Sequence, residues 1–146
     1  MKSPIRFVRK AIIDALTNNV TDENGANVPV YGRVPSETTY PFISVYNESV
    51  NEIDENRNSF NTVVSVKVDV VTRFNVNQGG SLRADTISDN VAQLIRTRSS
   101  GYPNITANNF KIYTVTLDNM VTIFDEETDH TYIRDILTFN IRVQEI

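Results

Sequence analysis

The chain has 146 residues, a net charge of −4 at pH 7 and no cysteine. This length is typical of one domain, and such a domain buries enough surface to fold without disulfides. The absence of cysteine excludes disulfide bonds, thiolate metal ligands and a cysteine nucleophile. Because 18 acidic residues outnumber 14 basic ones, the chain as a whole is not suited to binding a polyanion such as DNA. No apolar run reaches the length of a signal-peptide core or a membrane span, so we expect a soluble protein.

The sequence first predicts an N-terminal helix. Ser3 suits the cap position, and Pro4 suits the first helical position, where an N–H group is not needed. Apolar residues then recur at three- and four-residue steps, which places them on one face of the helix. They are Ile5, Val8, Ile12 and Leu16. Arg6, Arg9 and Lys10 form a small basic patch on the other side, which suits contact with DNA or with an acidic partner subunit.

Three strands are predicted next. Residues 28–34 predict a short strand, and residues 41–46 predict a second strand. Because Pro29 lacks an N–H donor, we expect the first of these strands to start late or to lie at the edge of a sheet. From Phe60 to Phe74, apolar residues favour the even positions and polar residues the odd ones. This alternation predicts a strand with one buried and one mostly wet face, long enough to project beyond the core.

The segment between the second and third strands, residues 47–59, is rich in charged and amide side chains. It predicts the exposed tip of a protruding long β-hairpin, mobile in an isolated subunit and ordered against a neighbour. We expect this tip and the polar face of the third strand to form a subunit interface. The candidate interface residues are Glu48, Glu52, Asp54, Glu55, Arg57, Lys67, Asp69 and Arg73.

The second half of the chain predicts one helix and three strands. The helix covers residues 82–96, with Ser81 as its cap, and the strands cover residues 110–118, 120–124 and 130–143. The predicted order is therefore α-β-β-β-α-β-β-β. Since hairpin spacing favours antiparallel pairing, we expect a single α+β domain over residues 1–146, with a mainly antiparallel sheet and both helices on one face.

The acidic turn at residues 125–130 is the first candidate for chemistry. It holds His130, the one histidine in the sequence, with four carboxylates before it: Asp125, Glu126, Glu127 and Asp129. Imidazole and carboxylate groups bind metal ions, but a calcium loop also needs a fixed ligand register and a glycine for its sharp turn. Because both are missing, we favour a solvated polar turn between two strands.

Two further candidates are weak. Gly79-Gly80 before the second helix would suit a phosphate cradle, yet no phosphate-binding glycine motif surrounds it, so a flexible helix entry is favoured. The carboxylates of residues 48–55 would need to be held rigidly for hydrolysis, and a mobile hairpin tip does not do that. We therefore expect no catalytic site, no cofactor and no metal.

Two short segments, and the elements after them, resemble a known protein family. The segments are Val30-Tyr31-Gly32-Arg33-Val34-Pro35 and Tyr40-Pro41-Phe42-Ile43-Ser44-Val45. The Val-rich strand ending at Thr72, a glycine-containing loop and the helix at residues 82–96 follow in the same order. Over residues 4–98 the chain resembles the tail terminator, or tail completion, proteins of long-tailed bacteriophages.

This resemblance implies a structural virion protein of the tail or neck, made in the host cytoplasm, whose copies form a ring, typically a hexamer. Such a ring sits on the last ring of tail tube protein, ends tube polymerisation and presents a surface to the head–neck connector protein. DNA passes through its lumen, and no membrane is contacted. The acidic segment at residues 48–57 and the turn at residues 125–130 match no motif of the family.

Three alternatives stay open at this point. One is another head–tail neck adaptor or a tail-tube protein. A tail-tube protein would form filaments in the electron microscope, whereas a terminator would form single rings. A second is a small metal-dependent enzyme built on the acidic turn, for which a tight metal site would be lost in His130→Ala. A third is a nucleic-acid-binding module, whose affinity would fall steeply with salt.

Overall fold

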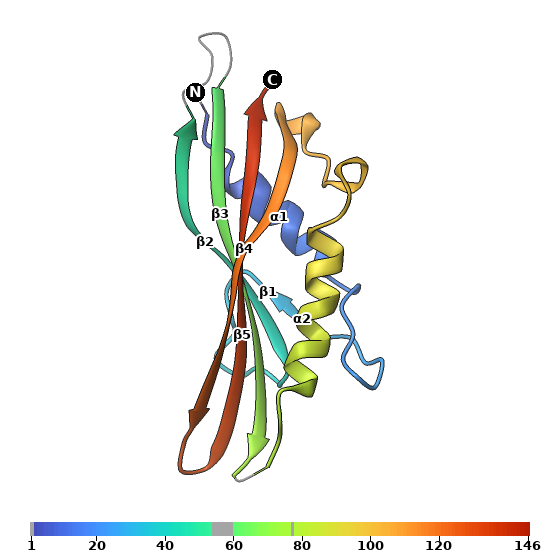
Figure 1. Ribbon diagram of the computed structural model, residues 1–146, viewed down its shortest axis with the longest axis vertical. Helices are drawn as coiled ribbons and strands as arrows, with labels where there is room; N and C mark the ends of the chain where they lie inside the picture. The colour runs from blue at the N-terminus through green and yellow to red at the C-terminus, as the bar shows by residue number, and fades with distance from the viewer. Residues whose placement is uncertain (1, 54–59, 77) are drawn as a thin grey trace.

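Two helices lie on one face of a twisted sheet (Figure 1). The computed structural model describes residues 2–53, 60–76 and 78–146. Over these residues the strand order is β1-β2-β3-β5-β4, in which β1 runs parallel to β2 and the other neighbours are antiparallel. The elements are α1 (Ile5–Leu16), β1 (Val30–Tyr31), β2 (Phe42–Ile53), β3 (Phe60–Asn75), α2 (Leu82–Ile95), β4 (Phe110–Glu126) and β5 (His130–Glu145), with short 3-10 helices at Ser99–Gly101 and Thr106–Asn108. The predicted α+β class and the mainly antiparallel sheet are confirmed.

The central strand is β3, which pairs with β2 on one side and with β5 on the other. Its even positions face the helices, and Val64, Val66 and Val68 are fully buried, as the alternation predicts. Burial of each such side chain contributes about 1.5–3 kcal/mol. The prediction that the other face is mostly wet was wrong, because side chains of both neighbouring strands flank a central strand. Ser65 and Asp69 on that face are also buried.

The two helices and the sheet share one hydrophobic core. At the N-terminus of α1 the cap position belongs to Pro4 rather than Ser3, and its carbonyl accepts hydrogen bonds from the amides of Phe7 and Val8. The helix therefore begins one residue later than predicted. The core residues of the two helices are Val8, Ile12, Leu16, Ile87, Val91 and Ile95.

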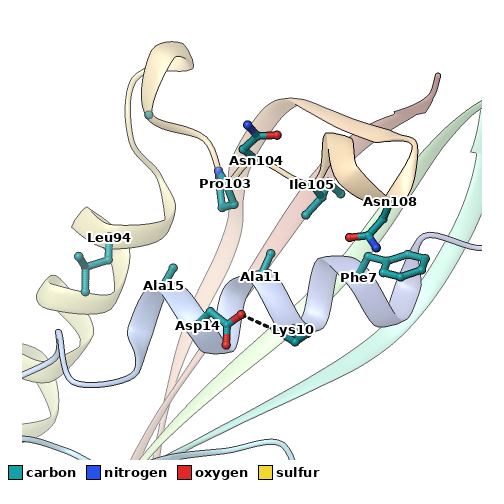
Figure 2. Close-up of a pocket in the computed structure, with 11 residues that line it drawn as sticks. Phe7, Lys10, Ala11, Asp14, Ala15, Leu94, Pro103, Asn104, Ile105 and Asn108 are labelled. Carbon is teal, nitrogen blue, oxygen red and sulfur yellow. Dashed lines mark hydrogen bonds and ion pairs between the residues drawn. The ribbon is translucent and has the colours of Figure 1, made fainter.

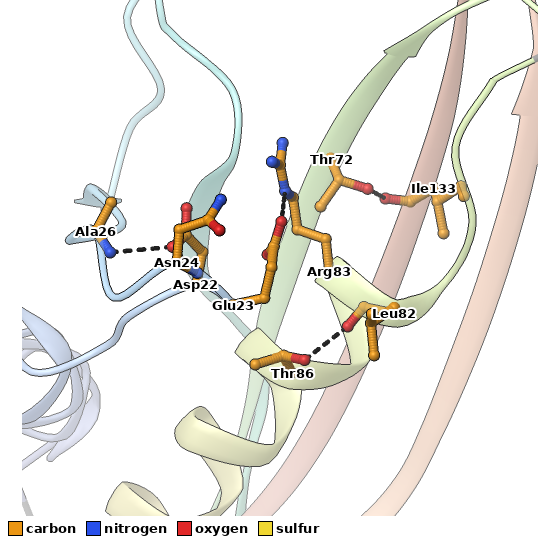
Figure 3. A network of polar contacts seen from close by, with 9 residues as sticks. All are labelled: Asp22, Glu23, Asn24, Ala26, Thr72, Leu82, Arg83, Thr86 and Ile133. Atoms are coloured by element: carbon orange, nitrogen blue, oxygen red, sulfur yellow. Dashed lines mark hydrogen bonds and ion pairs between the residues drawn. The ribbon is translucent and has the colours of Figure 1, made fainter.

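The loop after α1 is tied to α2 (Figure 3). Asp22 accepts hydrogen bonds from the backbone amides two and four residues after it, which shapes the turn at residues 22–26. Glu23 Oε1 then accepts a hydrogen bond from Nε of Arg83 at 2.8 Å. This ion pair joins the loop to the first turn of α2.

The two strands predicted at residues 110–118 and 120–124 are one strand, β4. The pairing with β5 continues from Phe110 to Glu126, but its register shifts near Ile112 and again between Leu117 and Asn119. Each shift changes the face on which the following side chains lie, so the alternation in the sequence breaks while the strand continues. The observed order is therefore α-β-β-β-α-β-β, with two C-terminal strands where three were predicted.

At the β1 edge of the sheet, the structure agrees better with the prediction made from the sequence. The predicted strand at residues 28–34 is reduced to β1, which pairs with Ile43 and Ser44 at the edge of the sheet. Pro29 lies just outside β1, and its carbonyl accepts a hydrogen bond from the Ile43 amide at 2.9 Å. The edge position expected from Pro29 is therefore confirmed.

The predicted protruding hairpin is only partly described. The pairing of β2 with β3 continues to Ile53 and Asn61, and β5 also pairs with this end of β3. The tip was predicted at residues 47–59, but residues 47–53 belong to β2, because their pairing with β3 continues beyond the apolar stretch that marked the second strand. The rest of the predicted tip, residues 54–59, lies outside the described residues. Projection of this hairpin beyond the sheet therefore stays a prediction.

Candidate assembly interface

The face of the sheet opposite the helices carries charged and aromatic side chains from neighbouring strands. Asp69 lies there beside Ser44 of β2 and Ile136 of β5, and Arg73 lies beside Tyr132. We call this side the open face. The predicted interface residues Lys67, Asp69 and Arg73 share it because they alternate along β3.

Asp69 and Arg134 form an ion pair across β3 and β5 on the open face. Asp69 Oδ1 accepts a hydrogen bond from Arg134 Nε at 3.3 Å, and Oδ2 accepts a second, shorter one from Nη2. The Asp69 side chain is 6% exposed and that of Arg134 is 38% exposed. The hydrogen bond with Asp69 raises the pKa of the Arg134 guanidinium above its usual value. Arg134 is therefore the member of this pair that a partner can reach.

An aromatic group occupies one end of the open face. The Arg73 guanidinium lies 4.4 Å from the ring centroid of Tyr40, which contacts the rings of Phe42 and Tyr132 at centroid distances of 5.2 and 5.9 Å. We call these four residues the aromatic corner. An arginine held against aromatic rings is a common feature of protein interfaces.

A hollow of about 330 Å³ lies against the ion pair and the aromatic corner. Its lining includes Arg134 and Tyr132, together with the carboxylate residues Asp125 and Glu127 from the end of β4 and the following turn. The charge of Asp125 also favours the protonated form of Arg134. The hollow thus combines aromatic rings with charges of both signs, which suits contact with the side chains of another protein.

Residues 127–130 form the turn that joins β4 to β5. The Glu127 amide donates a hydrogen bond to the His130 carbonyl at 2.9 Å, and the His130 ring lies 6.3 Å from that of Tyr132. Among the residues that the structure describes, no three His, Asp or Glu side chains lie close enough together to hold a metal ion.

Gly79 is fixed by packing and not by a phosphate motif. Its φ of +93° lies in the left-handed region, and a Cβ atom at this position would lie 2.3 Å from Cγ of Phe74. At Gly80 an added Cβ would meet nothing within 4 Å. The loop needs its first glycine for close approach to Phe74, so the favoured explanation of a merely flexible helix entry was incomplete.

Of the remaining predicted interface residues, the two that the structure describes lie away from the aromatic corner. Glu48 falls at the register shift between Asn47 and Ser49 of β2, and Glu52 is exposed near the end of that strand. Asp54, Glu55 and Arg57 lie outside the described residues. The described candidates therefore form two groups, one near the end of β2 and one along the open face.

The sequence did not reveal the exposure of the outer half of β4. From Thr116 to Glu126 every residue is exposed, so side chains on both faces of this part of the strand reach solvent. β4 is also the last strand of the described sheet, which leaves the backbone groups of its outer edge without a strand neighbour there. We call residues 116–130 the outer arm. Its exposed apolar residues are Leu117, Met120, Val121, Ile123 and Phe124.

A signal for this exposure is present in the sequence. A strand with one face in solvent has apolar residues only at alternate positions. Between Met120 and Phe124, apolar residues occupy both odd and even positions. A run of this kind is equally typical of a strand buried on both faces. The sequence alone therefore does not separate full burial from an exposed contact surface.

A second hollow, of about 440 Å³, lies beside α1 and the segment before β4 (Figure 2). Its lining includes the apolar residues Phe7, Ala11 and Ile105. Lys10 and Asp14 also line it and form an ion pair at 2.9 Å. The hollow is therefore a groove of mixed lining, in which apolar side chains lie beside an ion pair and two asparagines.

The predicted basic patch borders this groove. Arg6, Arg9 and Lys10 are all exposed, and the Arg6 guanidinium lies 4.6 Å from the ring centroid of Phe7. A further hollow of about 460 Å³ is lined by Lys2, Arg6 and Phe7, so the two hollows meet at Phe7. This side of α1 therefore presents depressions of mixed lining, one of which has the positive charges of Lys2 and Arg6 in its wall.

Over the part of the chain that the structure describes, no helix has both the length and the apolar character to cross a membrane. A scan against models of known protein families finds no match, and a search of curated proteins finds none either.

Proposed function

We propose that the chain is a structural virion protein, a tail terminator subunit whose copies form a ring on the end of the tail tube of a long-tailed bacteriophage. The ring ends tube polymerisation and joins the tail to the head–neck connector. The observation that carries this proposal is the outer arm, an edge-strand segment that exposes apolar side chains on both of its faces. The resemblance of residues 4–98 to tail terminator proteins supplies the kind of assembly.

Leaving the apolar side chains of the outer arm in water is unfavourable. A contiguous exposed apolar patch on a small protein marks a contact with another molecule, and a free strand edge invites pairing with another chain. The open face adds Arg134 and the aromatic corner, which suit a polar interface. A protein with these surfaces is suited to assembly, and the proposed role requires no catalytic, cofactor or metal site.

The charge balance also fits a ring through which DNA passes. Phosphate binding depends on Lys and Arg, and the chain carries a net charge of −4. A lumen without a concentration of positive charge lets DNA move through without being held. A contact between two different surfaces repeats from copy to copy. The copies close into a ring when the rotation from one copy to the next is a whole fraction of a full turn.

Negative-stain electron microscopy with a measurement of molar mass in solution tests the proposal. We expect closed rings of uniform copy number, and we expect these rings to stop growth when added to the polymerising tube protein of the same virus. A protein that stays monomeric at high concentration would contradict the proposal.

A tail-tube subunit is the second candidate, and the free edge of β4 favours it specifically. An edge that pairs repeatedly without closing produces filaments. Long tubes formed by the purified protein alone would support this candidate over the terminator.

A further inference from the structure

The outer arm is negatively charged as well as exposed. Residues 112–133 contain five acidic residues and neither lysine nor arginine. The five are Asp118, Asp125, Glu126, Glu127 and Asp129. The outer arm is therefore an apolar strand whose turn is strongly negative, and two such arms placed together would repel each other.

The N-terminal segment has the opposite character. Residues 2–13 contain four basic residues and no acidic one. Lys2 and Arg6 line one of two adjoining hollows that meet at Phe7, and Lys10, paired with Asp14, lines the other. Arg9 lines neither hollow and lies exposed on the helix three residues after Arg6. The apolar part of these depressions suits the apolar side chains of the outer arm, and the positive charges of this segment suit its negative turn.

The two matching surfaces lie apart in one molecule. In Figure 1 the turn between β4 and β5 lies at the lower end of the long axis, whereas α1 lies in the upper half with the chain termini. One chain therefore does not bring its own outer arm to its own α1. A second copy can bring its outer arm to this α1. Since every copy has both surfaces, the contact can repeat from copy to copy.

We propose that the outer arm of one copy docks on α1 of the next copy, with Phe124 against the apolar part of the groove beside Phe7 and the acidic turn against Arg6 and Arg9. This contact deepens the proposed function, since it supplies a head-to-tail joint for a ring. Two different surfaces meet in this contact. Each end of a growing chain of copies therefore keeps one unoccupied surface until the ring closes. Phe124, which is 59% exposed in the single chain, becomes buried at the centre of the contact.

Two variants and two matched controls test the contact. The arm variant is Phe124→Asp, and its control is Leu82→Asp, which changes another exposed apolar residue outside the contact. The helix variant is Arg6→Glu with Arg9→Glu. Its control is Arg33→Glu with Arg98→Glu, which makes the same change in net charge at exposed positions elsewhere. Circular dichroism and thermal unfolding establish that all four proteins are folded.

Analytical ultracentrifugation measures the self-association of each protein. We expect wild type and both controls to assemble, and the arm and helix variants each to associate at least about tenfold more weakly, as loss of a central interface residue does. An equal mixture of the arm and helix variants should form a 1:1 dimer and nothing larger, because only one intact pair of surfaces remains.

Three results would overturn the contact: a monomeric wild type, interface variants that assemble as well as their controls, or a mixture that stays monomeric. Negative-stain images separate this contact from the proposed function. Rings that neither variant weakens would reject the contact and leave the ring function standing. Open chains that both variants abolish would establish the contact and reject the terminator role.

Discussion

Asp135 is a fully buried carboxylate on the helix-facing side of β5. It accepts hydrogen bonds from Oγ of Ser88 at 2.8 Å and from Oγ1 of Thr122 at 2.7 Å. Asp85, one turn before Ser88 on α2, lies close enough to interact with it. Loss of solvation and a hydrogen bond with Asp135 raise the pKa of the Asp85 carboxyl above its usual value of 3.8.

The raised pKa of Asp85 predicts how stability depends on pH. The folded state binds this proton more tightly than the unfolded state, so the stabilisation is present below pH 3.8 and is lost as the pH rises through the raised pKa. Asp85→Asn removes the repulsion between two carboxylates and should stabilise the fold at pH 7. We expect less than about 1 kcal/mol, because Asp85 is exposed and water screens the interaction.

Urea unfolding at pH 4 and pH 7 checks this prediction. The difference between Asp85→Asn and wild type should be larger at pH 7 than at pH 4. Glu37→Gln removes an exposed carboxylate from the connector before β2 and should leave stability unchanged at both values. Destabilisation of Asp85→Asn at pH 7 would show that the charged form of Asp85 is favourable in the fold.

The Asp69–Arg134 pair predicts an asymmetric response to mutation. Arg134→Met leaves a buried carboxylate without its partner, whereas Asp69→Asn leaves a guanidinium that still reaches water. We expect Arg134→Met to cost about 1–3 kcal/mol and Asp69→Asn less, with the double variant recovering part of the loss. Chemical unfolding of all four proteins in a double-mutant cycle gives these values, and additive losses would show that the two groups do not interact.

Among the elements, the entry to α2 depends on one glycine and not on its neighbour. Gly79→Ala must accommodate both a positive φ and a Cβ atom pressed against Phe74, so we expect a loss of about 1–3 kcal/mol. Gly80→Ala has open space around it and should lie within about 0.5 kcal/mol of wild type. Unfolding midpoints of the two variants measure the difference, and equal values would mean that the loop relaxes around the added methyl group.

The elements also show which parts of the fold the sequence predicts. The alternation from Phe60 to Phe74 places β3 and its core face correctly, because a strand buried by helices needs one continuous apolar side. It does not predict the burial of Asp69, which depends on β3 being central in the sheet. Strand order arises from pairings between distant segments, and a local pattern does not contain them.

The C-terminal strands illustrate a second limit. The register shift between Leu117 and Asn119 interrupts the alternation, so one strand looks like two. The candidate site was affected in the same way. The alternation of β3 correctly places Lys67 and Arg73 on one face of the strand. The exposure of the outer arm was missed because apolar residues at both odd and even positions do not reveal whether they face a core or solvent.

At the scale of the whole molecule, charge is distributed unevenly along the long axis. The basic residues of α1 lie in one half, and the acidic turn after β4 lies at the far end of the other half (Figure 1). Such a molecule has an electric dipole along its length, which favours head-to-tail approach of two copies over head-to-head approach. Since exposed charges are screened, added salt should slow this association more than it speeds dissociation.

Hydrogen exchange should reveal where copies meet. In a single chain the edge strand β4 is paired only with β5 among the described strands, whereas β3 is paired on both sides. Amides of residues 116–126 should therefore exchange much faster than those of β3 in an isolated subunit. The Arg6→Glu, Arg9→Glu variant is the appropriate monomer reference, because its outer-arm peptides have the same sequence as those of wild type.

On assembly we expect exchange to slow in residues 116–126 and to stay unchanged in β3, since docking buries the outer arm without altering the core. The first helix should gain protection in the same samples, because it forms the other half of the contact. Equal exchange of the outer arm in the monomer and the assembly would contradict its role as a contact. Protection confined to residues 47–53 would instead place the joint at the end of β2, where Glu52 was first predicted to meet a neighbour.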